Sequence, residues 1–235
     1  ENAVAPLLRM SWEQTGGSTV KSFDVEYSRT TQLPGYTALN SRPDGLFGGN
    51  ADLGREYADT LKVGFSRETA STSLNASVFH RRDDDLVDWT YLGGAPYARQ
   101  ANPVDIDVNG VETFLRWRGD RFELITGYTW LDKDADYGSA DVDASYYALN
   151  FARHRVTLAV TWQPIESLNL RLDNAWRVHE ENALRTSSEE SFLSSASAAW
   201  KPPAWPGTQI VLVADNIADS DFEEFPGTPP MGRQV

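Results

Sequence analysis

The sequence predicts an all-β fold, an antiparallel transmembrane β-barrel, on three grounds. Apolar and polar residues alternate with period two along most of the 235-residue chain, and a strand sends successive side chains to opposite faces. The alternating segments run about ten residues or more, which suits tilted strands that cross a bilayer of roughly 30 Å. Aromatic residues lie near the ends of these segments, as they do in the interfacial girdles of outer-membrane barrels.

The clearest pair of strands lies between Tyr146 and His179, around a turn at residues 163–167. One face of the pair is apolar and carries Val156, Leu158, Val160 and Trp162 before the turn, and Leu168, Leu170, Leu172, Trp176 and Val178 after it. Arg171 and Arg177 take the opposite face. Reversing the register would turn each arginine toward lipid at about 2–4 kcal/mol near the midplane, so the orientation is strongly fixed.

The other strands are expected on both sides of this pair, which gives ten in all. They lie at residues 8–12, 19–28, 57–65, 74–91, 102–118, 122–130, 192–200 and 208–216, and a tail of residues 217–235 follows. Short connections near residues 14–18, 68–71, 119–120, 164–167 and 201–207 alternate with longer, more polar loops. Outer-membrane barrels show this asymmetry between periplasmic turns and extracellular loops.

The strand at residues 102–118 changes parity near its centre. Two apolar runs with opposite parity flank that point: Val104, Ile106 and Val108 before it, and Val111, Leu115 and Trp117 after it. A bulge or kink at Asn109–Gly110 is expected to restore the register.

Composition excludes several classes of protein. The chain has 34 acidic and 21 basic residues, a formal net charge of −13, and so offers no basic surface to nucleic acid. It has no cysteine, which removes disulfides, thiolate chemistry and Cys-based zinc sites. No run of 18 apolar residues occurs, so transmembrane helices are excluded. No charged and apolar leader follows Glu1, so any signal peptide is expected upstream or already removed.

The sequence offers no catalytic or metal-binding pattern, and we expect neither enzyme activity nor a cofactor. His80, His154 and His179 lack a two-His metal spacing, and no serine lies in a G-x-S-x-G elbow. The acidic residues at 83–85 and 88 could bind calcium through carboxylate oxygens. They lack the ordered ligand spacing of a calcium loop, which favours a solvated acidic face.

Four short motifs follow one another along most of the chain: GGNADLGRE at residues 48–56, NGVE at 109–112, NFARHR at 150–155, and DNIADSDF with a later GR at 215–233. They resemble, in the same order, motifs of the TonB-dependent outer-membrane receptors, over the C-terminal half of their barrel. The chain departs from the family pattern by lacking prolines after Asn50, after Gly54 and at position 152.

The resemblance implies a plugged barrel of about 22 strands. Residues 1–235 would then be a single domain, the C-terminal portion of that barrel, fitting the twelfth to the twenty-first strand without the plug and the final strand. The implied function is active uptake, in the bacterial outer membrane, of a scarce bulky solute: a ferric siderophore, cobalamin or an oligosaccharide. The implied partners are outer-membrane lipid and lipopolysaccharide, a small-molecule or metal-chelate substrate, and the periplasmic TonB protein, which supplies energy through the plug.

Substrate-binding residues are expected at the outer strand ends and in the outer loops. The candidates are Tyr36, Trp89, Tyr91, Tyr97, Arg99, Tyr146 and Arg153. Aromatic rings at these places could stack on a ligand, or they could anchor the barrel in the girdle, as with Trp89, Tyr91 and Tyr147.

Four arginines are expected to face the lumen: Arg153, Arg155, Arg171 and Arg177. They could contact the plug or an anionic substrate, or they could pair with neighbours such as Asp173.

Two other interpretations remain open at the level of sequence. One is a self-contained ten-stranded outer-membrane hydrolase of the omptin kind, which would need carboxylates and histidines gathered in the lumen. The other is a soluble β-sandwich that binds carbohydrate. Dependence of the purified chain on detergent would separate the sandwich from both membrane interpretations.

Overall fold

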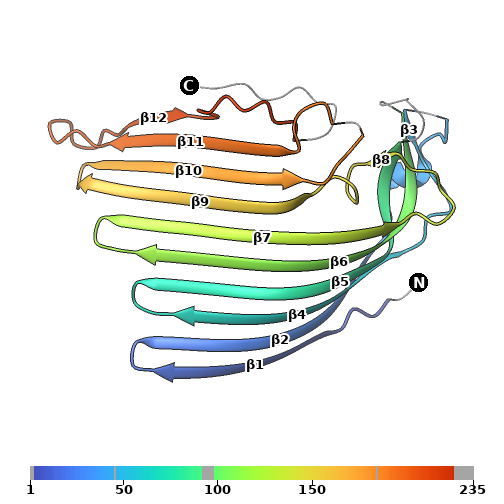
Figure 1. Cartoon of the computed structure of the whole chain (residues 1–235), viewed down its shortest axis with the longest axis horizontal. Coiled ribbons are helices and arrows are strands. Elements are labelled where there is room, and N and C mark those ends of the chain that lie inside the picture. The colour runs from blue at the N-terminus through green and yellow to red at the C-terminus, as the bar shows by residue number, and fades with distance from the viewer. Residues whose placement is uncertain (1–2, 45, 92–97, 184, 225–235) are drawn as a thin grey trace.

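A computed structural model of the chain describes residues 3–44, 46–91, 98–183 and 185–224. These residues form one sheet, in which ten long strands pair in the order β1-β2-β4-β5-β6-β7-β9-β10-β11-β12. Figure 1 shows them side by side as a wall, with the short turns at one end and the long loops at the other. The ten predicted strands are confirmed, and within the described residues no second sheet covers the wall, so the sandwich interpretation is wrong.

The long strands have these bounds: β1 (Leu7–Gly16), β2 (Thr19–Gln32), β4 (Glu56–Glu68), β5 (Thr72–Tyr91), β6 (Arg99–Arg118), β7 (Phe122–Asp136), β9 (Ala152–Ile165), β10 (Leu168–His179), β11 (Glu190–Trp200) and β12 (Ile210–Ala214). The outer loops add α1 (Tyr36–Asn40), β3 (Phe47–Gly48) and β8 (Ala144–Ser145). β3 runs parallel to β6, and β8 pairs with β5. None of the described helices has the length and apolar character needed to cross a membrane.

The pairing register collects the predicted apolar side chains on one face of the wall. Val160, for example, lies opposite Leu124 on β7 and Leu172 on β10. Many large apolar side chains of this face are exposed, among them Leu8, Met10, Trp12, Phe23, Leu61, Phe65, Val78, Leu158, Trp162, Leu172 and Leu212. A water-soluble monomer rarely exposes a contiguous apolar patch beyond a few hundred Å². This face is therefore the lipid-facing one.

Two aromatic belts bound the apolar face. Trp12, Trp117, Phe122, Trp162 and Trp200 lie near the short turns, and Tyr27, Tyr128, Trp130 and Trp176 lie nearer the long loops. Phe122 and Trp130 are eight positions apart on β7, roughly 27 Å along a strand and about 20 Å of depth at the usual tilt. That spacing matches the apolar band of an outer-membrane barrel, about 25 Å tall.

The wall does not close on itself within the described residues, because β1 and β12 end the order of paired strands. A self-contained ten-stranded barrel would require these two strands to pair with each other. The hydrolase interpretation is therefore wrong on architecture.

The expected bulge at Asn109–Gly110 is also wrong. β6 pairs without a register shift past this point with both β5 and β7, and the shift lies instead in β5, between Asp83 and Leu86. Gly110 serves a different purpose: it lies opposite Phe79, whose ring occupies the place that a Cβ of residue 110 would take.

The parity change in β6 reflects burial under a loop. Val104, Ile106 and Val108 lie on the lumenal face and are buried together with Ala148 from the loop at residues 137–151. A second buried cluster joins Ala38, Leu53 and Ala101. Both clusters lie at the outer end of the wall. The loop at residues 137–151 packs on its lumenal face, whereas Ala101 has the strand parity of Asp105, so the second cluster packs on the outward face.

Candidate binding site at the outer loops

Arg99, the first residue of β6, lies among aromatic rings from three other segments. Its guanidinium carbon is 3.9 Å from the ring centroid of Tyr146, 5.1 Å from that of Phe47 and 5.9 Å from that of Tyr91. The rings of Tyr91 and Tyr146 are 5.4 Å apart, and Trp89 meets Phe47 edge to face at 5.7 Å. We call these five residues the Arg99 cluster. Cation–π attraction holds its members together.

The structure thus brings together four predicted site residues, Trp89, Tyr91, Arg99 and Tyr146. It adds Phe47, which the sequence analysis missed. The short parallel pairing of β3 with β6 sets Phe47 opposite Arg99, and a two-residue strand leaves no local pattern from which this contact could be predicted.

Tyr91 is deeply placed in the cluster, with only 5% of its surface exposed. Burial, reinforced by a hydrogen bond with Tyr146, raises the pKa of the Tyr91 phenol well above its usual value. The group therefore stays neutral, and its ring packs against protein.

The remaining predicted site residues lie elsewhere. Tyr36, at the start of α1, has 82% of its surface exposed. Arg153 forms an ion pair with Glu180 at 2.5 Å. Tyr97 lies outside the described residues. Within the described part of the chain, no ring contact or ion pair joins Tyr36 or Arg153 to the Arg99 cluster.

A buried carboxylate anchors the loop that carries Tyr146. Asp88 has no exposed surface, and it accepts hydrogen bonds from the Tyr137 hydroxyl at 2.8 Å and from the backbone N–H groups of Tyr147 at 3.1 Å and Ala148 at 3.0 Å. Burial, with the nearby Asp88 charge, raises the pKa of the Tyr137 phenol, which keeps it a donor. Asp88 therefore fixes residues 137–148 against the wall.

Of the four acidic residues near the end of β5, Asp85 is exposed as the sequence suggested, but Asp83 and Asp88 are buried. Asp83 pairs with Arg81 at 2.5 Å. Asp88 accepts its hydrogen bonds from the loop that carries Tyr146. Asp84 is more exposed and pairs with Arg82 at 3.0 Å. Among the described residues, no group of three or more His, Cys, Asp or Glu side chains is arranged to hold a metal ion.

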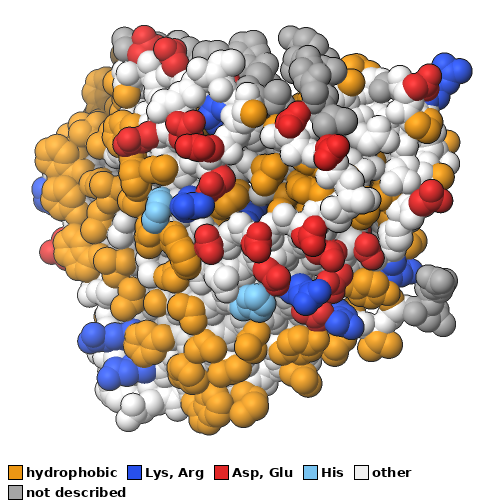
Figure 2. All heavy atoms as spheres, turned by 45° about the vertical axis from the view of Figure 1, so that its right-hand side comes forward, with side chains coloured by type: hydrophobic (Ala, Val, Ile, Leu, Met, Phe, Trp, Pro, Cys, Tyr) orange, Lys and Arg blue, Asp and Glu red, His pale blue; other side chains and the backbone are white. Residues whose placement is uncertain are grey.

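On the outward face, acidic residues continue along β6 and β7 beyond the apolar band. Asp105 lies opposite Asp136, and Asp107 lies opposite Asp134. Figure 2 shows acidic side chains, interspersed with a few basic ones, gathered next to apolar surface.

Each histidine contacts a different part of the wall. His80 lies 3.1 Å from the Asn109 side chain, and His154 lies 3.0 Å from the Tyr128 hydroxyl. His179 packs against Phe222 with ring centroids 5.2 Å apart. Burial, together with Arg185 and Arg177, lowers the pKa of His179 to about 4, so the imidazole is neutral at pH 7. The three histidines do not converge on one site.

Three of the four arginines predicted to face the lumen have carboxylate partners. Arg171 pairs with Asp173 at 2.7 Å, as the sequence analysis proposed, and Arg177 pairs with Glu224 at 3.0 Å. Arg153 pairs with Glu180. Arg155 is exposed and has no ion pair with any described residue.

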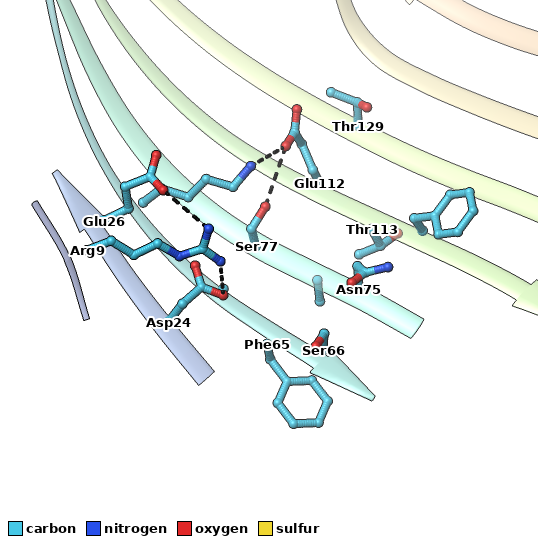
Figure 3. Close-up of a pocket in the computed structure, with 14 residues that line it drawn as sticks. Arg9, Asp24, Glu26, Phe65, Ser66, Asn75, Ser77, Glu112, Thr113 and Thr129 are labelled. Atoms are coloured by element: carbon cyan, nitrogen blue, oxygen red, sulfur yellow. Dashed lines mark hydrogen bonds and ion pairs between the residues drawn. The ribbon is translucent and has the colours of Figure 1, made fainter. Parts of the chain in front are cut away.

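Away from the outer loops, charged side chains line a hollow of about 520 Å³ on the lumenal face. Arg9 lies 3.9 Å from both Asp24 and Glu26, and Lys62 pairs with Glu112 at 3.0 Å. Figure 3 shows Arg9 reaching toward Asp24 and Glu26. These residues lie at the depth of the apolar band but on the opposite face, so the face turned away from lipid is the polar one.

Comparison with known proteins agrees with this architecture. The sequence profile described as "TonB dependent receptor-like, beta-barrel" matches residues 19–217. No curated protein sequence matches the chain.

Similar solved structures include the copper transporter OprC, with a TM-score of 0.70 at 16% identity over 96% of this chain and 38% of that chain. The FrpB iron transporter from Neisseria meningitidis has a TM-score of 0.67 at 16% identity over 97% of this chain and 37% of its own. The siderophore receptor PirA from Pseudomonas aeruginosa has a TM-score of 0.65 at 16% identity over 97% and 38%. The chain spans well under half the length of these proteins.

Proposed function

The chain belongs to the TonB-dependent receptor family of β-barrels, and on that premise we propose that it forms the C-terminal part of a receptor for active uptake of a scarce, bulky solute. Members of this family are transporters of the bacterial outer membrane and not enzymes. The observation that carries the proposal is the open ten-stranded wall, apolar on one face and charged on the other, of which all strands but β1 lie inside the matched region.

We infer that the solute is a ferric chelate, such as a ferric siderophore. Three structures with the same fold are described as a copper transporter, a siderophore receptor and an iron transporter. The outer loops that would meet such a solute are packed around the Arg99 cluster and anchored by Asp88. Cobalamin and oligosaccharides are the competing substrate classes, and the same experiment tests them.

The charged hollow around Arg9, Lys62 and Glu112 supports a second part of the proposal, contact with a plug domain. Charged side chains on the inner wall of a barrel need water or polar protein groups opposite them. A plug that fills the lumen would supply these groups and would carry the energy-coupling contact with periplasmic TonB. Lipid and lipopolysaccharide would surround the apolar band and the acidic surface beside it.

The test uses the full-length receptor in a Gram-negative host that lacks its own chelate receptors. Radiolabelled ferric siderophores, cobalamin and a maltooligosaccharide are offered to cells with and without TonB. The proposal expects accumulation of a ferric chelate only in cells that contain TonB. Entry that persists without TonB would show a passive pore, and accumulation of cobalamin or the sugar alone would show that the substrate class is wrong.

A further inference from the structure

A cavity of about 420 Å³ opens on the lumenal side at the outer ends of β7, β9 and β10. Lys133 contributes to its lining from β7, Arg155 from β9 and Arg177 from β10. The loop at residues 137–151 contributes Tyr146 and Phe151, and the segment after β12 contributes Glu224. The volume lies within the range of small-molecule sites, roughly 300–1,000 Å³.

Two like charges lie directly opposite each other in this cavity. Arg155 and Arg177 are cross-strand partners in the pairing of β9 with β10. Like charges in this position repel and destabilise the sheet unless something neutralises them. Glu224 pairs with Arg177 at 3.0 Å, whereas Arg155 has no ion pair among the described residues.

Lys133 adds a third cation to the same cavity. Its ammonium nitrogen lies 4.6 Å from the centroid of Phe151, and burial lowers the pKa of Lys133. The carboxylates whose charges act on Lys133, Asp83 and Asp88, are already engaged by Arg81 and by the loop. In a chain with a net charge of −13, the described residues that line this cavity thus include three Lys or Arg side chains and one carboxylate, Glu224.

Aromatic rings form the other part of the cavity lining. Phe151 is buried and lies under Lys133, and Tyr146 is shared with the Arg99 cluster. Tyr147 also lines the cavity and has 54% of its surface exposed, so its ring is open to a ligand. Rings and cations side by side suit a flat ligand that carries negative charge, because its ring stacks while its anionic group pairs with arginine.

We propose that this cavity binds an anion carried on a flat apolar ring, of the aromatic carboxylate class, with Arg155 as the main charge partner and Lys133 and Arg177 in support. Its part in uptake rests on the proposed function, since the anion would be a portion of the transported solute. Binding itself is measurable without transport.

The experiment follows ¹⁹F NMR signals of 4-fluorobenzoate and of its neutral counterpart 4-fluorobenzamide with the purified full-length receptor in detergent. The receptor is expected to broaden the benzoate signal and to leave the benzamide signal sharp. Arg155→Gln is expected to weaken benzoate binding about tenfold, the effect of losing one charge-assisted hydrogen bond. Lys133→Gln is expected to weaken it less, because Lys133 acts at the edge of the site.

The matched control is Arg121→Gln, which removes an arginine at the opposite end of the wall, where its guanidinium donates to the Pro164 carbonyl at 2.7 Å. This variant should bind benzoate as the wild type does. Heat-modifiable migration on a gel checks that each variant is folded, and Arg155→Gln should fold well because it relieves repulsion with Arg177.

Unchanged benzoate binding by folded Arg155→Gln would overturn the proposal, as would equal binding of benzoate and benzamide. Benzoate binding by a receptor that accumulates no chelate would support this site and contradict the proposed uptake function. Chelate uptake by a receptor that binds no benzoate would support the uptake function and contradict this site.

Discussion

At the scale of single residues, the most consequential side chain in the outer loops is Asp88. A carboxylate with no exposed surface is costly to bury unless its oxygens are hydrogen-bonded, and three donors from residues 137–148 meet that need. The sequence showed Asp88 only as the last member of an acidic cluster. Its burial depends on a loop about 50 residues further along the chain, which local patterns do not report.

We predict that Asp88→Asn frees this loop. An amide has one acceptor oxygen in place of two, so at least one of the three donors loses its partner while buried, at about 1–3 kcal/mol. Hydrogen exchange of the amides at residues 144–151 should speed up, with the rest of the wall unchanged. Asp84→Asn, at a more exposed position paired with Arg82, is the control and should leave that exchange unaltered. Equal protection of the loop in Asp88→Asn and wild type would refute the anchoring role.

His179 gives a prediction about pH. Its pKa in the fold is about 4, whereas a histidine in the unfolded chain titrates near 6.5. Between these values the unfolded state binds the extra proton, so stability is fully present above pH 6.5 and falls as the pH drops toward 4. We expect a loss of at most about 2 kcal/mol after allowance for partial exposure.

The measurement is the temperature at which the folded, heat-modifiable form of the receptor is lost, at pH 7 and at pH 4.5. His179→Gln should reduce the difference between the two temperatures. His80→Gln should not, since His80 lies at the surface near Asp107. A difference that His179→Gln leaves untouched would assign the acid sensitivity to other groups.

At the scale of elements, period-two alternation predicted the strands and their two faces well, because each residue of a strand reports its own exposure to lipid or lumen. The alternation failed as a guide where a loop distant in sequence covers the strand and so sets its exposure. The change of parity in β6 reads as a bulge, but Val104, Ile106 and Val108 are apolar because the loop at residues 137–151 covers them. α1, β3 and β8 were missed because two to five residues carry too little periodicity.

In the candidate site, too, local sequence pattern predicted some residues, whereas contacts between distant segments decided the others. Aromatic residues at strand ends identified Trp89, Tyr91 and Tyr146, which do come together around Arg99. The partners that complete the arrangement, Phe47 and Asp88, act through contacts between separate loops. Such contacts depend on how the outer loops pack against one another, and the spacing of residues along one strand does not reveal that packing.

The two faces of β9 can be tested with adjacent residues. Leu158 lies on the apolar face opposite Thr126, midway between the two aromatic belts, and Ala159 lies on the lumenal face opposite Asp173. We predict that Leu158→Arg costs about 2–4 kcal/mol, the cost of an arginine facing lipid at the midplane. Ala159→Arg should be tolerated, because its charge would face the lumen beside Asp173. Folding into lipid vesicles at increasing urea gives both values, and equal destabilisation would contradict the assignment of faces.

At the scale of the whole molecule, the wall is a strip with two open edges. Backbone N–H and C=O groups of β1 and β12 that point away from the sheet have no strand beside them among the described residues. In lipid each such unsatisfied group costs several kcal/mol, which is why membrane barrels close. The charged lumenal face adds to the cost of inserting an open strip, because Lys62 and Glu112 would be exposed to lipid on that face.

We therefore predict that residues 1–235 alone do not form a stable monomer. Refolded into detergent or vesicles, the chain should associate through its edges into mixed oligomers, and sedimentation should show no discrete monomer. The full-length receptor, treated in the same way, should give a monomeric, heat-modifiable barrel, because under the proposed function its further strands would pair with β1 and β12. Adding the separately produced N-terminal part of the receptor should rescue a share of the 235-residue chain into that form. A monodisperse, protease-resistant monomer of the 235-residue chain would show that its edges are satisfied internally, which the pairing order of the strands does not allow.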